Sequence, residues 1–215
     1  MEVQEMKFGK TVAVVLASSV LLAGCTTDKK EIKAYIEQMD KIKKDEEPIK
    51  SVGKKIAELD EKKGKLTSKL NSQGQDATIR EETVKDLIKN TDERLKEFKK
   101  EEDAIKKSEQ DFKKAGSHID TIGNDVKRKE VEQLNDALKE KYKIHVKYAE
   151  TYKKAVNSEK VLFKYLGQID ATQQGVREKE KPIIQNYKKV KEITDEYSKV
   201  NKKVAREKQD VDQLV

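Results

Sequence analysis

Residues 84–112, VKDLIKNTDERLKEFKKEEDAIKKSEQDF, contain a row of mainly apolar residues at steps of seven. This row comprises Val84, Thr91, Phe98, Ile105 and Phe112, and Ile119 continues it. Ile88 and Leu95 begin a second row beside the first. Because a helix has about 3.6 residues per turn, two such rows lie on one face. The stretch therefore predicts a long helix with a narrow apolar seam.

Three further segments repeat this spacing. The first, residues 28–71, carries Tyr35, Ile42, Ile49, Ile56 and Leu70, with Val52, Leu59 and Leu66 beside them. Another carries Val131, Leu138, His145, Tyr152 and Leu166, with Leu134, Tyr148, Ala155 and Leu162 beside them. The last carries Val176, Ile183, Val190, Tyr197, Val204 and Val211. Each segment predicts a helix about 60–65 Å long at about 1.5 Å per residue.

Polar breaks at 71–76, 116–124 and 167–175 separate the four segments. Two capping boxes are expected, one from Asp28 with Glu31 and one from Thr78 with Glu81. Pro48 keeps the seven-step phase on both sides, so it predicts a kinked helix. Pro182 predicts either another kink or the first residue of a later helix.

Short breaks between helices of equal length favour antiparallel neighbours. The predicted fold is all-α, an elongated up-down-up-down four-helix bundle over residues 28–215. A three-helix, spectrin-like rod is the alternative. We expect modest stability because polar residues interrupt the seams. These residues are Lys63, Thr91, Glu102, Lys141 and Glu159.

The composition limits the core. Charged residues make up 41% of the chain and hydrophobic residues 34%, with no tryptophan, whereas ordinary domains are about 25% charged and about 45–50% apolar. Disorder is one interpretation of such values. Only two prolines occur, however, and the apolar residues are strongly periodic, so long thin helices fit better.

The N-terminus has the order of a lipoprotein signal peptide, residues 1–24. Lys7 and Lys10 precede an apolar run, and Leu22-Ala23-Gly24-Cys25 follows it. The small residues predict signal-peptidase recognition at Leu22, Ala23 and Gly24, and the single cysteine predicts lipidation at Cys25. Residues 25–27 would then form a short tether. The run falls short of the about 20 residues that a membrane span needs. Either Met1 or Met6 could start translation.

Charge indicates the class of partner. The net charge is +7, and it stays +7 without residues 1–24, which hold two lysines and two glutamates. Nucleic-acid binding usually requires clustered basic residues with exposed aromatic residues. The basic residues of this chain are spread along it, so nucleic-acid binding is not expected. Anionic cell-wall polymers and anionic lipid head groups are the expected partners. Lys29, Lys30 and Lys33, directly after Cys25, would lie at the membrane surface.

Residues able to carry chemistry are few. His118 and His145 are the only histidines, and they lie on different predicted helices, so no metal site and no cofactor are expected. His145 lies on a seam and predicts a hydrogen-bonded core residue. The other candidates are four tyrosines, Tyr142, Tyr148, Tyr152 and Tyr165. These rings could stack on sugars, although core packing is favoured.

Three stretches also carry a family resemblance: residues 22–25, 45–50 (DEEPIK) and 157–160 (NSEK). Together with the Lys/Glu-rich helical remainder, they resemble the YkyA-type cell-wall-binding lipoproteins of Gram-positive bacteria, and most of all the staphylococcal members. The resemblance implies an all-helical lipoprotein on the outer face of the membrane, with no catalytic residues.

Two functions fit these features. The first is a non-enzymatic, membrane-anchored monomer whose basic surface contacts the anionic cell envelope. The alternative is a structural spacer or scaffold that binds a protein partner at the membrane, its charge serving solubility. An enzyme or small-ligand receptor is the weakest interpretation, because no catalytic spacing is found.

Overall fold

A computed structural model describes residues 24–215, with side chains from Thr27 onward. The predicted signal peptide, including Leu22 and Ala23, lies outside the described residues. The structure has five helices: α1 (Gly24–Glu46), α2 (Pro48–Gln73), α3 (Ala77–Ile119), α4 (Asp125–Leu166) and α5 (Gln173–Asp212). No strand occurs within this part of the chain, which confirms the all-α prediction.

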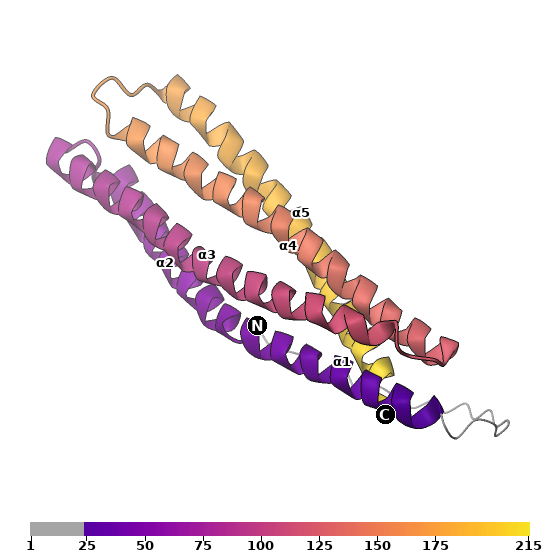
Figure 1. Cartoon of the computed structure of the whole chain (residues 1–215). Coiled ribbons are helices and arrows are strands. Elements are labelled where there is room, and N and C mark those ends of the chain that lie inside the picture. Colours follow the sequence, from indigo (N-terminus) through magenta and orange to yellow (C-terminus); the bar gives the residue numbers. More distant parts are fainter. Residues whose placement is uncertain (1–23) are drawn as a thin grey trace, which may run out of the picture.

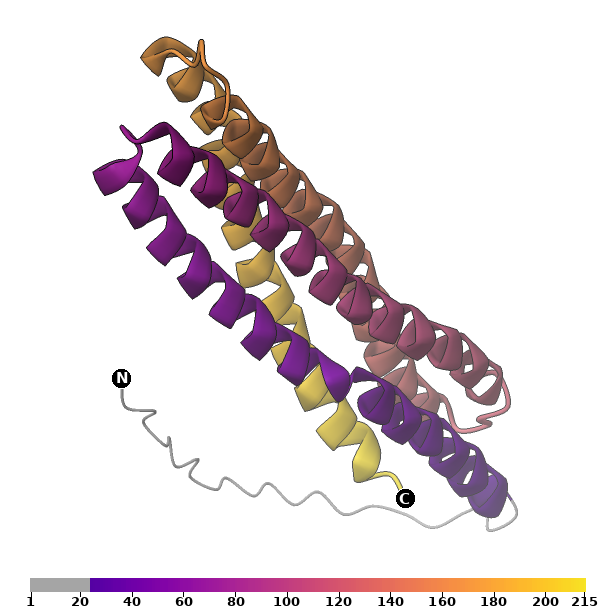
Figure 2. The same ribbon diagram turned by 90° about the vertical axis from the view of Figure 1, so that its left-hand side faces the viewer.

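Helices α1 and α2 form one kinked arm. Pro48 is the first residue of α2, and only Glu47 separates the two helices. Glu47 keeps helical dihedrals of −51° and −40°, and its amide bonds Lys44 at 3.3 Å, three residues back. Because proline has no amide hydrogen, the helical hydrogen-bond ladder is interrupted here. Figure 1 shows the change of direction between α1 and α2, and Figure 2 shows the short break between them.

The rod has four arms, which are α1 with α2, then α3, α4 and α5. They run up, down, up and down. Close backbone contacts join α1 and α2 to α3, α3 to α4, and α4 to α5. Figure 1 shows the α3–α4 turn, the start of α1 and the end of α5 at one end of the rod. The α2–α3 and α4–α5 turns lie at the other end. The topology is thus the four-arm bundle, not the three-helix rod.

The helix starts differ from the two predicted capping boxes. Asp76, not Thr78, caps α3 by accepting from the Ile79 amide at 3.0 Å. Asp28 lies inside α1 and instead accepts from the amides of Gly123 and Asn124 at 2.7 and 3.1 Å. A buried carboxylate gains more from two amides that lack helical partners than from its own helix. The capping-box spacing was therefore misleading in both places.

The breaks are shorter than predicted. Helix α3 continues through Gly116 to Ile119, and α5 begins at Gln173 with Thr172 as its cap. Pro182 lies inside α5, so it does not start a separate helix.

Burial follows the predicted seams in α3 and α4. All six members of the α3 row are buried, from Val84 to Ile119. One apolar cluster fills the end of the rod around Ile32, Tyr35 and Val211, and a second surrounds Phe98. The α5 row is only half-buried before Val211, because α5 packs closely on α4 and not on the first arm.

Candidate functional site

The end of the rod that carries Cys25 is the first candidate site. Gly24 and Cys25 lie in the first turn of α1, and the Cys25 side chain is outside the described residues. Asp28 is 5% exposed and ties this turn to the α3–α4 turn through its two amide hydrogen bonds. Glu31 bonds His118 of α3 at 2.8 Å, which lowers the pKa of the Glu31 carboxyl. The helix beside the predicted lipid site is therefore held to the bundle from its first turns.

Lysines surround a shallow hollow on α1 just after this point. Lys29, Lys30 and Lys33 are exposed, and with Ala34 and Glu37 they line a depression of about 520 Å³. None of the three lysines forms an ion pair within residues 27–215. The three lysines therefore border one hollow, and their ammonium groups are available to anions. That they lie at the membrane surface stays a prediction.

Polar residues that interrupt the apolar seams form hydrogen bonds and ion pairs across helices. Lys63 of α2 bonds Glu159 of α4 at 2.8 Å, and Glu159 also bonds Arg94 of α3 and the Tyr187 hydroxyl of α5. The Arg94 guanidinium reaches Asp60 at 3.0 Å as well. One polar cluster therefore joins α2, α3, α4 and α5 in the half of the rod away from Cys25.

Arg94 was missed by the sequence analysis although it is fully buried. Burial alone would lower the pKa of its guanidinium, but the Glu159 carboxylate beside it raises that pKa above its ordinary value. A sequence signal existed. Position 94 lies three residues after Thr91 and four before Phe98, so it shares their helix face.

Two more buried polar contacts lie toward the middle of the rod. His145 is 3% exposed and bonds Glu101 at 3.1 Å, which confirms the prediction of a hydrogen-bonded core histidine. Lys141 pairs with Glu46, whose other oxygen accepts from the Ser108 hydroxyl at 2.6 Å. Each carboxylate meets a group from another helix, so these contacts set the axial alignment of the arms.

The tyrosines of α4 mainly pack. Tyr142 and Tyr152 are buried, Tyr148 is half-buried, and the Phe98 and Tyr152 ring centroids are 4.5 Å apart. Tyr165 is half-buried and accepts from the Thr172 amide at 2.9 Å, which orders the α4–α5 turn. Gly175 permits this, because a Cβ there would lie 2.1 Å from the Tyr165 hydroxyl. Core packing, the favoured prediction, is confirmed for the first three rings.

The two histidines are not brought together, since each meets a different glutamate on a different helix pair. The carboxylates of Glu130, Glu207 and Asp210 do approach one another within 4.8 Å near the Cys25 end. Arg206 pairs with Glu207, so part of this negative charge is already compensated. No helix within residues 24–215 offers an apolar run that could span a bilayer.

Comparison with known proteins identifies the family. A family model described as "YkyA: Putative cell-wall binding lipoprotein" matches residues 30–214. The chain belongs to the YkyA family. This confirms the resemblance seen in the sequence and places the chain among lipoproteins.

Two relatives extend the comparison. The uncharacterized lipoprotein YkyA of Bacillus subtilis (strain 168) is 21% identical over 208 residues, covering 94% of this chain and 91% of its own. A conserved Staphylococcus aureus protein of unknown function, solved as a crystal structure, is 70% identical with a TM-score of 0.81. That match covers 90% of this chain and 97% of the solved one. The rod is therefore similar to an experimentally observed fold.

Proposed function

We propose that this YkyA-family protein is a non-enzymatic lipoprotein, anchored through Cys25 on the extracellular face of the cell membrane, whose basic rod binds anionic polymers of the cell wall. The lysines of α1 and α2 that have no ion pair within residues 27–215 carry the proposal. At the anchored end these are Lys29, Lys30 and Lys33, and on the distal arm Lys54, Lys62 and Lys69. Family membership supports the wall as the partner.

The anchor and the first lysines act together. A single acyl chain gives marginal membrane attachment, whereas the two chains of a diacylglyceryl group on Cys25 would give stable anchoring. Each lysine near an anionic surface contributes about 1 kcal/mol. Three lysines within nine residues of Cys25 would add to this attachment at an anionic membrane surface.

Lipidation is tested at Cys25 itself. In cells given labelled fatty acid, Cys25→Ala should remain an uncleaved precursor without label, because the thiol is the group that receives the lipid. The wild-type chain is the control. Label in the mutant would refute the anchor.

Wall binding is tested by retention on purified cell wall. The chain from Thr26 to Val215 retains both apolar clusters, which lie between Ile32 and Leu214, so it serves as the soluble domain. Retention should fall several-fold between about 0.1 M and 1 M salt, where the Debye length shrinks from about 10 to 3 Å. Wall stripped of its anionic polymers should retain little.

A matched pair of variants locates the contact. In the lipidated protein on liposomes, replacing Lys54, Lys62 and Lys69 with Gln should weaken wall binding. The same change at Lys29, Lys30 and Lys33 should not, because there those lysines face the membrane. Salt-insensitive retention, or none, would contradict the proposal.

The alternative, a scaffold for a protein partner, rests on one observation. Ile169 in the α4–α5 turn is 97% exposed, and a partner could cover it. In that case Ile169→Ser would abolish capture of the partner, and salt would have little effect.

A further inference from the structure

An apolar groove runs between the first arm and α5. Leu134 and Leu138 of α4 form its floor, Met39 and Ile42 of α1 form one wall, and Val204 of α5 forms the other. The first four of these side chains also belong to the core and are at most 5% exposed. It lies beside the α1–α2 junction, where the first arm and α5 both pack on other helices and not closely on each other. Its volume is about 440 Å³, within the about 300–1,000 Å³ of small-molecule sites.

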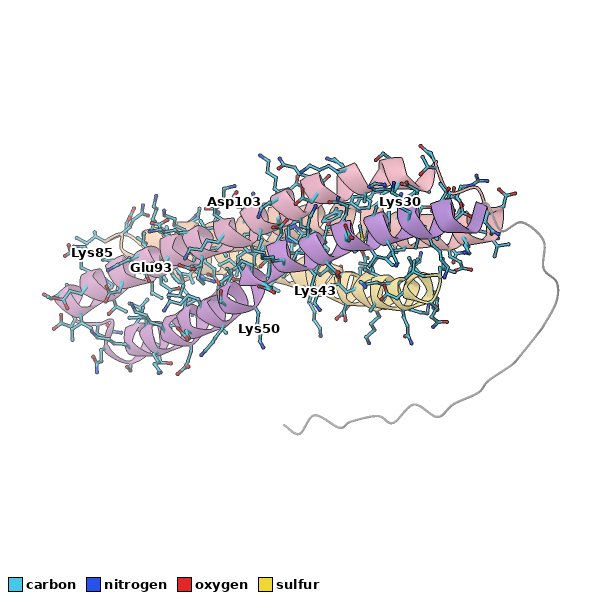
Figure 3. The ribbon with its side chains drawn as sticks, turned by 60° about the horizontal axis from the view of Figure 1, so that its bottom comes forward. Lys30, Lys43, Lys50, Lys85, Glu93 and Asp103 are labelled. Atoms are coloured by element: carbon cyan, nitrogen blue, oxygen red, sulfur yellow. The ribbon has the colours of Figure 1, made fainter. Side chains whose placement is uncertain are left out.

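The charged residues that line the groove differ in whether they have an ion-pair partner. Lys141 is paired with Glu46 and Lys208 with Asp212, so these groups are compensated. Lys43 and Lys50 also line the groove and have no ion pair within residues 27–215. Both lie near the α1–α2 junction in Figure 3. Glu47 is the opposing charge, exposed and without an ion pair in the same part of the chain.

We propose that this groove binds one acyl chain of an amphiphile whose anionic head group meets Lys43 and Lys50. The apolar floor and walls suit a hydrocarbon chain, and the two ammonium groups suit a carboxylate or phosphate. The size argues against a docked helix. A single helical turn about 10 Å wide and 5.4 Å tall already occupies about 420 Å³. This inference goes beyond wall binding, and its test does not depend on the wall.

The test is titration of the soluble domain, residues 26–215, with dodecanoate below its micelle concentration, monitored by calorimetry. We expect saturable binding of one dodecanoate per domain. Decanoate should bind more weakly by up to about fourfold for each lost methylene, since each buried methylene contributes about 0.8 kcal/mol. Dodecanol, which lacks the charge, should bind at least about fivefold more weakly, the effect of about 1 kcal/mol.

Paired variants locate the site. Val204→Phe fills the groove and should abolish binding, whereas Val146→Phe, at an exposed valine of α4 outside the groove, should not. Lys43→Gln with Lys50→Gln should weaken binding about fivefold or more. The same change at Lys85 and Lys106, exposed lysines of α3, should leave it unchanged. Glu47→Gln should tighten it.

Several results would overturn the proposal. These are absent or non-saturating binding, binding that survives Val204→Phe, and equal losses in the two lysine pairs. Dimerisation of the free domain that Val204→Phe abolishes, seen by light scattering, would assign the groove to a second copy. The lysine pairs lie on the surface, so they remain informative if Val204→Phe prevents folding, which helical circular dichroism would reveal.

Discussion

At the scale of single residues, the effect of a polar residue in an apolar helix seam depends on which residues it contacts. Lys63 and Glu159 interrupt two different seams, yet they bond each other across 96 residues of sequence. A buried ion pair adds little stability relative to apolar residues, because desolvation offsets the attraction. Removing one partner is different, since the remaining charge stays buried without compensation.

Glu159→Gln should therefore destabilise the soluble domain by about 3–5 kcal/mol. Arg94, fully buried, would lose its nearest carboxylate. Urea unfolding followed by circular dichroism measures the loss. Glu150→Gln, an exposed glutamate on the same helix, is the control and should cost less than about 0.5 kcal/mol. Equal costs for the two variants would contradict the structural role of the cluster.

At the scale of elements, the turns are held by contacts that come from distant helices. Asp28 of α1 satisfies two amides at the α3–α4 turn, so the first turns of α1 and this turn form one unit. That unit carries the predicted lipid site, so a lipid on Cys25 would be joined directly to a turn that is tied to α3 and α4.

Asp28→Ala should cost about 1–3 kcal/mol, because the amides of Gly123 and Asn124 would lose their acceptor. Hydrogen exchange should also speed up at these two amides. Asp40→Ala, an exposed aspartate of α1, is the control and should be nearly neutral. Unchanged exchange at both amides in Asp28→Ala would refute the link.

The tyrosines make the stability of the folded domain depend on pH in the alkaline range. Burial raises the pKa of six of the seven phenols, whereas hydrogen bonds from the Thr172 side chain and backbone lower that of Tyr165. The six are Tyr35, Tyr142, Tyr148, Tyr152, Tyr187 and Tyr197. Their folded pKa values exceed the unfolded value of about 10. Their contribution to stability is therefore complete below about pH 10 and is lost as the pH rises further.

We expect the tyrosinate absorbance of the folded domain to show one early phenol, Tyr165, and the other six only on alkaline unfolding. Tyr165→Phe should remove the early phase alone. Seven phenols titrating together near pH 10 in the folded protein would contradict this assignment.

At the scale of the whole molecule, the rod separates its two ends by about the length of one long helix. α4 has 42 residues, which corresponds to about 63 Å. The α2–α3 and α4–α5 turns are together at the end opposite the start of α1 (Figure 1). A rod anchored through Cys25 and standing upright would therefore present these two turns to the wall.

Fluorescent labels on Gln75→Cys and Gln173→Cys, in liposomes carrying the lipidated protein, test this orientation. We expect both labels about 60 Å from the bilayer and close to each other. A label at Ser117→Cys, near the other end of α3, is the control and should lie near the bilayer. Tip labels at the membrane would mean that the rod lies flat along it.

The helices and their buried faces could be predicted from the sequence. Seven-step periodicity is a local property, because side chains on one helix face recur with the helical repeat whatever the partner is. The α3 row was therefore predicted correctly from Val84 to Ile119, as was the core position of His145. Glycine and asparagine marked the turns for the same local reason, with boundaries wrong by several residues.

Which residues contact one another across helices could not be predicted in the same way. Pairing Lys63 with Glu159, or Asp28 with the α3–α4 turn, depends on the axial offset between helices far apart in sequence. The spacing of apolar residues within one helix does not specify the axial offset between two helices. The half-covered row of α5 and the groove beside it are likewise consequences of how the arms splay. The seam of α5 looks as regular as that of α3, and packing alone leaves it half-exposed.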